Sequence, residues 1–212
     1  DRMGAFDRDV TAWWAGLTFP LTLGQIFASL CTHVGVTPAT TTFLNSTHSY
    51  TAAPFASNTL TGRAMLKYIA EAACAIARFT RAGELELDWF GAVSYASPEA
   101  GIVTGGITLA EYEVAAIDKL QTQAETTDLG VVIGTGSNAY VLLASPLIVG
   151  ETDAEIRAFA TPIYTRLTAF AAFTPINAKV KSDWSLQSGD IIDIIYEGNT
   201  YSLPIYTQSV AW

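Results

Sequence analysis

Two long stretches of this chain contain no Asp, Glu, Lys or Arg, and they constrain what it can fold into. The first extends from Val10 to Gly62 and the second from Leu129 to Gly150. Both exceed the roughly 20 residues that cross a bilayer, but prolines interrupt the first and a Gly-Thr-Gly-Ser-Asn turn interrupts the second. Lipid leaves such backbone without hydrogen-bond partners. We therefore expect a soluble protein without stable membrane insertion, in which these stretches lie in the core or against neighbouring subunits.

Charge also limits the class of partner. Charged residues make up 15% of the chain and the net charge is −9, whereas a typical globular protein has about 25% charged residues. Phosphate binding depends on Lys and Arg, of which there are 11. We therefore expect no nucleic-acid specificity. An oligomer follows as a hypothesis, because a surface that is short of charge is suited to contacts between subunits.

The first 100 residues predict helices followed by a β-hairpin. Residues 22–35 contain a capping-box pattern, an apolar helical face and a terminal Gly, and residues 61–75 predict a second helix. Between them the sequence predicts loop or extended structure with one short strand. Residues 77–90 then alternate apolar and acidic positions around an Arg-Ala-Gly turn, which is typical of a half-buried hairpin. We expect residues 1–100 to form a helical and β-hairpin subdomain.

The second half predicts mainly strands around one helix. Residues 115–143 indicate three strands joined by tight turns, which we expect to form a meander. A second capping box begins a helix over 152–167, and Pro162 is expected to kink or split it. Residues 190–212 predict a further hairpin and a final strand. The fold class is thus α+β, with a small β-barrel-like antiparallel sheet and flanking helices over 101–212, plus the α/β helix-hairpin subdomain.

Patterns that would carry catalysis or metal binding are weak in this sequence. His33 and His48 are the two histidines, and Cys31 and His33 point to different sides of a helix. Cys31 and Cys74 are too few for a disulfide framework and are expected to be buried on apolar helix faces. The glycines of 134–138 complete neither a nucleophile elbow nor a phosphate loop. We predict no catalytic residues, no cofactor and no metal site.

Two acidic groups could in principle serve as paired carboxylates for cleaving cell-wall polymers. The residues Glu84, Glu86 and Asp88 alternate with apolar positions, which favours a solvated strand face. The acids between 151 and 155 lie at a helix start, where negative charge stabilises the helix dipole. A cell-wall hydrolase or endopeptidase therefore stays open as an alternative function.

Aromatic residues make up 11% of the chain and have two readings. They could form a platform for a sugar, which keeps a carbohydrate-binding or receptor-binding module as a further alternative. Core packing and subunit contacts are favoured, because Trp and Tyr are common interface anchors. The candidate subunit-interface residues are Trp13, Trp14, Tyr196, Tyr206 and Trp212.

Residues 61–90 carry a resemblance to a known family. The helix begins Thr-Gly-Arg-Ala-Met-Leu-Lys-Tyr-Ile-Ala-Glu, and the segment ends Leu-Glu-Leu-Asp-Trp-Phe. It resembles the tail hub proteins of phages and prophages of Gram-positive hosts, in which a T-x-R-x-x-L-x-x-I-A-E helix leads to a strand, a basic residue with Gly at the turn, and L-x-L-x-W-[FY]. Three further stretches agree in order: Asp1-Arg-Met3 with Phe19-Pro20-x-Thr22 and His33-Val-Gly-Val36, Asn138-Ala-Tyr140 with Ser145-Pro-Leu147, and Ser188-Gly-Asp-Ile-Ile192. The family more often has Asn-Pro-Leu where this chain has Ser145-Pro146, which affects a turn.

The resemblance implies a non-enzymatic structural role. The resembled proteins are similar to the baseplate hub of contractile phages. In that hub each subunit has two related β-barrels, so a trimer presents a pseudo-sixfold ring to the hexameric tail tube. Expected partners are further copies of the chain, as a homotrimer at full length, together with tail-tube and tail-tip proteins. The expected location is the virion tail, made in the bacterial cytoplasm from a prophage gene. Family members carry sequence before the Asp-Arg-Met stretch, so we expect a missing N-terminal region and a tail-hub barrel over 101–212.

Overall fold

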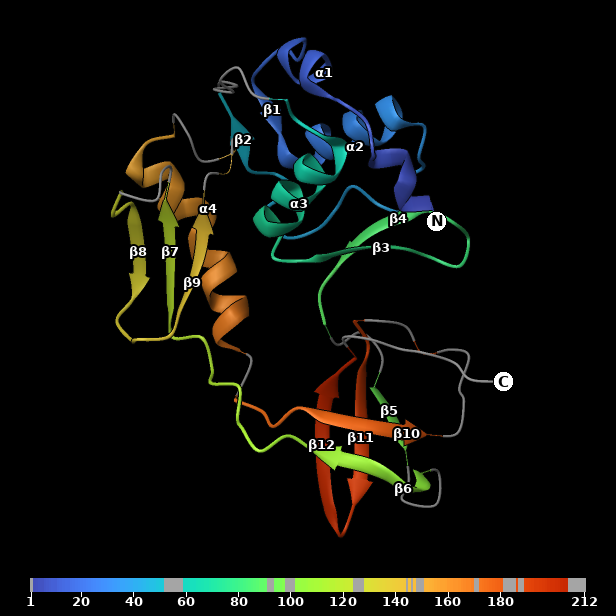
Figure 1. The fold of residues 1–212 in the computed structure, drawn as a ribbon. Coiled ribbons are helices and arrows are strands. Elements are labelled where there is room, and N and C mark those ends of the chain that lie inside the picture. The colour runs from blue at the N-terminus through green and yellow to red at the C-terminus, as the bar shows by residue number, and fades with distance from the viewer. Residues whose placement is uncertain are drawn as a thin grey trace. The chain divides into compact units, whose positions relative to one another are not determined.

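The computed structural model describes most of the chain and divides it into two compact units (Figure 1). The first unit combines Asp1–Asp88 with Ile117–Phe170, and the second combines Trp89–Ala116 with Ala171–Trp212. Each unit is therefore built from two separated stretches, whereas the expected division at residue 100 follows chain order. The described residues are 2–51, 59–90, 94–97, 102–123, 128–143, 145, 147, 151–169, 172–180, 186 and 189–205.

Local sequence signals set the ends of the helices in the first unit. Both predicted capping boxes are confirmed: the Thr22 hydroxyl accepts from the Gln25 N–H, and the Thr152 hydroxyl accepts from the Glu155 N–H. Each satisfies a backbone donor that a helix start would otherwise leave without a partner. Gly35 ends its helix in the left-handed conformation, with φ 77°. The helices are η1 (a 3-10 helix, Arg2–Phe6), α1 (Thr11–Ala15), α2 (Leu23–Val34), α3 (Gly62–Ala72) and α4 (Asp153–Thr168).

The longer helices pack one apolar face each into the core of the first unit. In α3 the predicted inward residues Met65 and Ile69 are fully buried, and in α4 Phe159 and Ile163 are buried in the same way. Burial of apolar area, at roughly 25 cal/mol per Å², is the main force that holds these helices together. In α2 the buried side chains are Leu23, Ile26, Phe27, Leu30, Cys31 and Val34.

Pro162 lies inside α4, yet the helix is continuous from Asp153 to Thr168. The expected split at the proline does not occur. A proline removes one backbone hydrogen bond from the helix, and the buried side chains of Phe159 and Ile163 on either side of it hold the helix against the core.

The predicted hairpin after α3 is confirmed. Strands β3 (Ile76–Phe79) and β4 (Leu85–Asp88) pair antiparallel, and Leu85 and Leu87 are buried as their alternation predicts. Before α3, β1 (Leu21–Thr22) pairs with β2 (Ser49–Tyr50), which is the short strand expected in that loop region.

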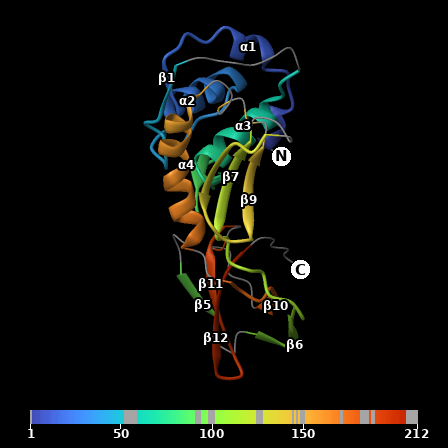
Figure 2. The same cartoon turned by 90° about the vertical axis from the view of Figure 1, so that its left-hand side faces the viewer.

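A three-stranded sheet beside α4 completes the first unit (Figures 1 and 2). Its strands β7 (Lys119–Gln123), β8 (Val131–Gly134) and β9 (Ala139–Leu143) were expected as a meander, but the order is β8-β7-β9. The meander prediction is wrong because β9 pairs parallel to β7 on the edge opposite β8. The connection from β8 to β9 therefore crosses the start of the central strand.

The second unit contains the remaining described strands. Strands β11 and β12 form the predicted hairpin, whose turn residues Glu197 and Gly198 both have positive φ. A small core forms around Leu186, Ile192 and Ile194. The strands are β5 (Ser94–Ser97), β6 (Ile102–Leu109), β10 (Ile176–Val180), β11 (Ile191–Tyr196) and β12 (Asn199–Pro204).

The α+β class is confirmed, but the described strands form no closed barrel. They make five separate sheets of two or three strands each. Most pairs are antiparallel, while β5 with β11 and β7 with β9 are parallel. Strand β6 was not predicted, because its Gly105 and Gly106 indicate a domain boundary in the sequence.

Candidate functional site

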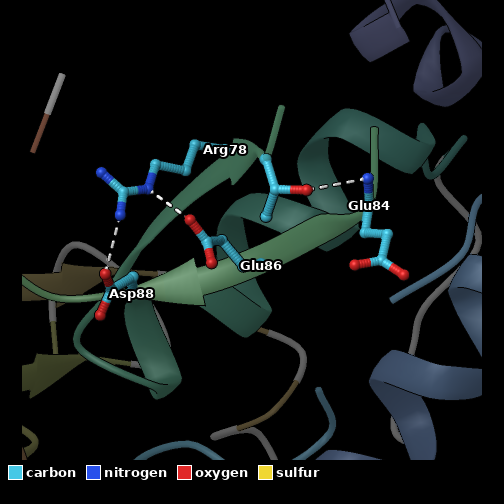
Figure 3. A network of polar contacts seen from close by, with 5 residues as sticks. Arg78, Glu84, Glu86 and Asp88 are labelled. Carbon is cyan, nitrogen blue, oxygen red and sulfur yellow. Dashed lines mark hydrogen bonds and ion pairs between the residues drawn. The ribbon is translucent and has the colours of Figure 1, made fainter. Parts of the chain in front are cut away.

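The acidic hairpin face is an ion-paired cluster (Figure 3). The guanidinium of Arg78 on β3 reaches Glu86 at 2.7 Å and Asp88 at 2.9 Å on β4. Arg78 and Glu86 are partly buried, with side chains that are 20% and 23% exposed. The Glu84 backbone N–H donates to the Thr80 hydroxyl at 3.2 Å, which closes the turn end of the hairpin. The face that the sequence indicated as solvated thus stabilises the hairpin by joining its two strands.

The acids at the start of α4 form a second polar group. The Glu155 carboxylate accepts from the Thr152 N–H at 2.8 Å, and hydrogen bonds from the Thr152 backbone and hydroxyl hold the pKa of Glu155 below its usual value. Burial raises the pKa of Glu151, and the neighbouring Glu155 adds to the rise. These two carboxyl groups therefore differ in environment, and one of them is engaged in helix capping.

The buried Tyr50 of β2 and the partly buried His48 just before it lie next to these acids. Tyr50 is 2% exposed, and its hydroxyl has no hydrogen-bond partner among the residues that the structure describes. Burial raises the pKa of Tyr50, and the charge of Glu151 acts in the same direction. The His48 ring contacts Tyr50 at 4.9 Å and Phe159 at 5.5 Å between ring centroids, and burial lowers its pKa. His48 thus serves as an aromatic packing residue between β2 and α4.

Of the other ligand-type residues, His33 lies at the surface and both cysteines are buried. His33 stacks on Trp13, with ring centroids 5.9 Å apart. Burial raises the pKa of Cys31 and of Cys74 to about 12, so both thiols stay protonated at neutral pH. Cys74 lies in the turn after α3 with φ 45°, which corrects its expected place on a helix face. Within the described ranges, no group of three or more His, Cys, Asp or Glu could hold a metal ion.

The Gly-rich run 134–138 is a connection between two strands, as the sequence indicates. Asp118, just before β7, accepts hydrogen bonds from the backbone N–H groups of Ser137 at 3.2 Å and Asn138 at 2.8 Å. A Cβ on Gly136 would lie 1.8 Å from the Asp118 carboxyl carbon. The glycine is therefore needed for close approach to this carboxylate.

The candidate interface aromatics fall into different environments. Trp13 is partly buried and its indole N–H donates to the Ser29 hydroxyl at 3.1 Å, whereas Trp14 is 2% exposed and belongs to the core. Tyr196 packs beside the small core of the second unit. Tyr206 and Trp212 lie outside the described residues. Trp14 therefore leaves little surface for a neighbour, while Trp13 and Tyr196 retain some.

Two surface patches that sequence reasoning missed hold all the exposed large hydrophobic side chains of the described part. The sheet patch consists of Leu129, Val141 and Leu143, which are 74%, 42% and 40% exposed. The loop patch consists of Leu109, Tyr112 and Val114, which are 37%, 65% and 39% exposed. The uncharged run 129–150 contains the sheet patch, but its sequence alone does not show which positions face outward.

Membrane insertion finds no support among the helices. In the part of the chain that the structure describes, none has the length and apolar character that crossing a bilayer requires.

Comparisons with known proteins find a likeness among solved structures. No family model matches the chain, and no curated protein matches it. Among solved structures, the fold is similar to the crystal structure of the 43 kDa tail protein of prophage MuSo2 from Shewanella oneidensis, with a TM-score of 0.53 and 10% sequence identity. The likeness covers 96% of this chain and 64% of that protein. The chain therefore has the fold of a prophage tail protein and spans less than two thirds of its length.

Proposed function

We propose that this chain is a structural, non-enzymatic subunit of a phage or prophage tail, in a hub or baseplate that joins the tail tube to the tail tip through a ring-shaped oligomer. The supporting observation is the fold likeness to a prophage tail protein along 96% of the chain. The motif resemblance of residues 61–90 to tail hub proteins rests on sequence and favours the same kind of protein. Two different properties of the molecule thus agree.

The proposed partners are other copies of the chain, as a homotrimer at full length, and the tail-tube and tail-tip proteins. The proposed location is the virion tail, after synthesis in a bacterial cytoplasm from a prophage gene. The fold likeness carries no information on the host, so the Gram-positive host rests on the motifs alone. No cofactor or metal belongs to this role.

Two features of the described residues support a role that depends on contact. The sheet β8-β7-β9 contains a single charged residue, Lys119, in a chain of net charge −9. The exposed large hydrophobic side chains of the described residues all belong to the sheet patch or the loop patch, and exposed apolar patches mark interaction sites. Two acids of the hairpin, Glu86 and Asp88, are engaged by Arg78, which favours a structural use of that face.

The oligomeric state of the full-length protein tests the proposal. Light scattering should give the mass of a trimer, and electron microscopy of the same sample should show rings. A strictly monomeric full-length protein contradicts the ring. Loss of turbidity when the protein meets purified cell walls would favour a hydrolase, and saturable glycan binding would favour a receptor-binding module.

A further inference from the structure

Val141 and Leu143 of the sheet patch lie on the outer face of the sheet β8-β7-β9, and Leu129 lies in the connection just before β8. Leu120 and Leu142 are 0% and 2% exposed, so they face the opposite side of the sheet. Helix α4 packs against β7 and β8 of this sheet (Figure 2). On the outer face Gln121 is paired across to Val141, and its side-chain amide donates to the Leu129 carbonyl at 2.8 Å. The outer face thus combines exposed aliphatic groups with amides.

This outer face also differs in charge from the rest of the chain. Its strands contain no acidic residue, and their one charged side chain is Lys119 at the start of β7. Two copies that each have a net charge of −9 repel over most of their surface. They can approach most easily where acidic groups are few, and an exposed acid, Asp128, does lie next to Leu129.

Strand β9, at one edge of the sheet, gives a second reason to expect a binding partner on this part of the sheet. Its sequence Ala-Tyr-Val-Leu-Leu has no charge and no proline, and these are the usual devices that protect an exposed strand edge from pairing. By contrast, the carbonyl of Val132 on the opposite edge accepts from the Arg157 guanidinium at 3.2 Å. The edge formed by β9 is therefore less protected than the edge formed by β8.

The loop patch has the complementary character. Its hydrophobic side chains are interleaved with the exposed acids Glu111 and Glu113, and the run 109–114 contains no basic residue. The run is held in place by backbone hydrogen bonds, from the Ala110 N–H to Pro175 at 2.9 Å and between Val114 and Phe173 at 2.8 and 3.1 Å. It is a fixed acidic and apolar surface with Tyr112 most exposed.

We propose that the loop patch of one copy of this chain docks on the sheet patch of the next copy, with Tyr112 against Val141 and Leu143 and with Glu111 and Glu113 facing Lys119. This inference rests on the proposed ring and specifies its contact. Because the two patches differ, the contact is head-to-tail, and such contacts close into rings when the rotation permits. A buried Tyr is a frequent energetic centre of a protein interface.

A charge-swap experiment on the full-length protein tests the contact. Glu113→Lys and Lys119→Glu should each raise the dissociation constant in sedimentation velocity at least about tenfold, because each places like charges opposite one another. The double variant Glu113→Lys/Lys119→Glu should recover part of the lost affinity. Lys67→Glu is the matched control, since it makes the same charge change on α3 at a side chain that is 69% exposed. Its ion pair with Glu71 lies within α3 and outside both patches, so the change should leave association unchanged.

A second variant separates the apolar part of the contact from its charges. Tyr112→Ala should weaken association by at least about tenfold, while circular dichroism shows an unchanged fold. Single swaps that behave like Lys67→Glu, or a double variant no better than the singles, overturn the docking and leave the ring itself standing. A monomeric wild-type protein overturns both.

Discussion

The side-chain amide of Asn45 donates to the backbone carbonyl of Phe159, 3.0 Å away and 114 positions later in the chain. The same nitrogen donates to the Ala72 carbonyl at 2.9 Å, at the end of α3. One side chain in the loop before β2 thus ties together two helices from distant parts of the sequence. Asn45 has φ 61°, in the left-handed region that Asn adopts more readily than most residues.

Replacing Asn45 by Gly should lower the free energy of unfolding by about 1–3 kcal/mol, because two buried carbonyls lose a donor while the backbone conformation is kept. Urea unfolding followed by circular dichroism measures the change. Glu197→Gly is the control, since Glu197 also has positive φ but lies in an exposed hairpin turn. Equal effects of the two substitutions would show that the amide contacts of Asn45 contribute little.

The capping box of α4 gives a second test. Thr152→Ala removes the hydroxyl that accepts from the Glu155 N–H, and loss of such a cap costs about 1 kcal/mol. Thr161→Ala is a matched change in the same helix, where the hydroxyl only returns to the Arg157 carbonyl one turn earlier. The difference between the two midpoints in urea isolates the cap. A cost at position 161 as large as at 152 would contradict this account.

The sequence predicts well those structural features that depend on residues close together in the chain. The capping boxes at Thr22 and Thr152 and the hairpin over 77–90 depend on groups within a few positions of one another, and all three are confirmed. The parallel pairing of β9 with β7 depends on a crossover that local turn chemistry does not specify. A glycine-containing strand such as β6 likewise exists through pairing with β10, whose residues lie 67 to 78 positions later in the chain than their partners.

The same distinction applies to the candidate site. Sequence composition indicates contact surfaces but does not show that Trp14 is enclosed while Tyr112 is exposed. Exposure depends on which elements pack on each face, so the two patches emerge only from the folded chain. A large apolar ring stabilises a protein core as well as a subunit interface. Aromatic residue type alone therefore does not distinguish the buried Trp14 from an interface residue.

The crossover between β8 and β9 should depend on Asp118 and Gly136 as a pair. Asp118→Ala removes the acceptor for two backbone N–H groups and should cost about 1–3 kcal/mol. Gly136→Ala should destabilise further, because its Cβ would collide with the Asp118 carboxylate. In the double variant that collision is absent, so the combined cost should be smaller than the sum of the single costs. Strict additivity in urea unfolding would contradict direct contact.

Glu151 should make stability depend on pH in a direction that can be worked out. Its pKa in the folded state is raised by burial and by Glu155, so the folded protein binds the Glu151 proton more tightly than the unfolded chain. The contribution is fully present below the ordinary carboxyl pKa and is lost as the pH rises through the higher, folded-state pKa. Wild-type protein should therefore lose stability relative to Glu151→Gln as the pH rises through that range.

Melting temperatures of the two proteins across mildly acidic to neutral pH measure the difference, in which the effects of other titrating groups largely cancel. Asp153→Asn is the control at an exposed acid of the same helix start. A gap between wild type and Glu151→Gln that does not change with pH would mean that Glu151 keeps its ordinary affinity for the proton in the folded protein.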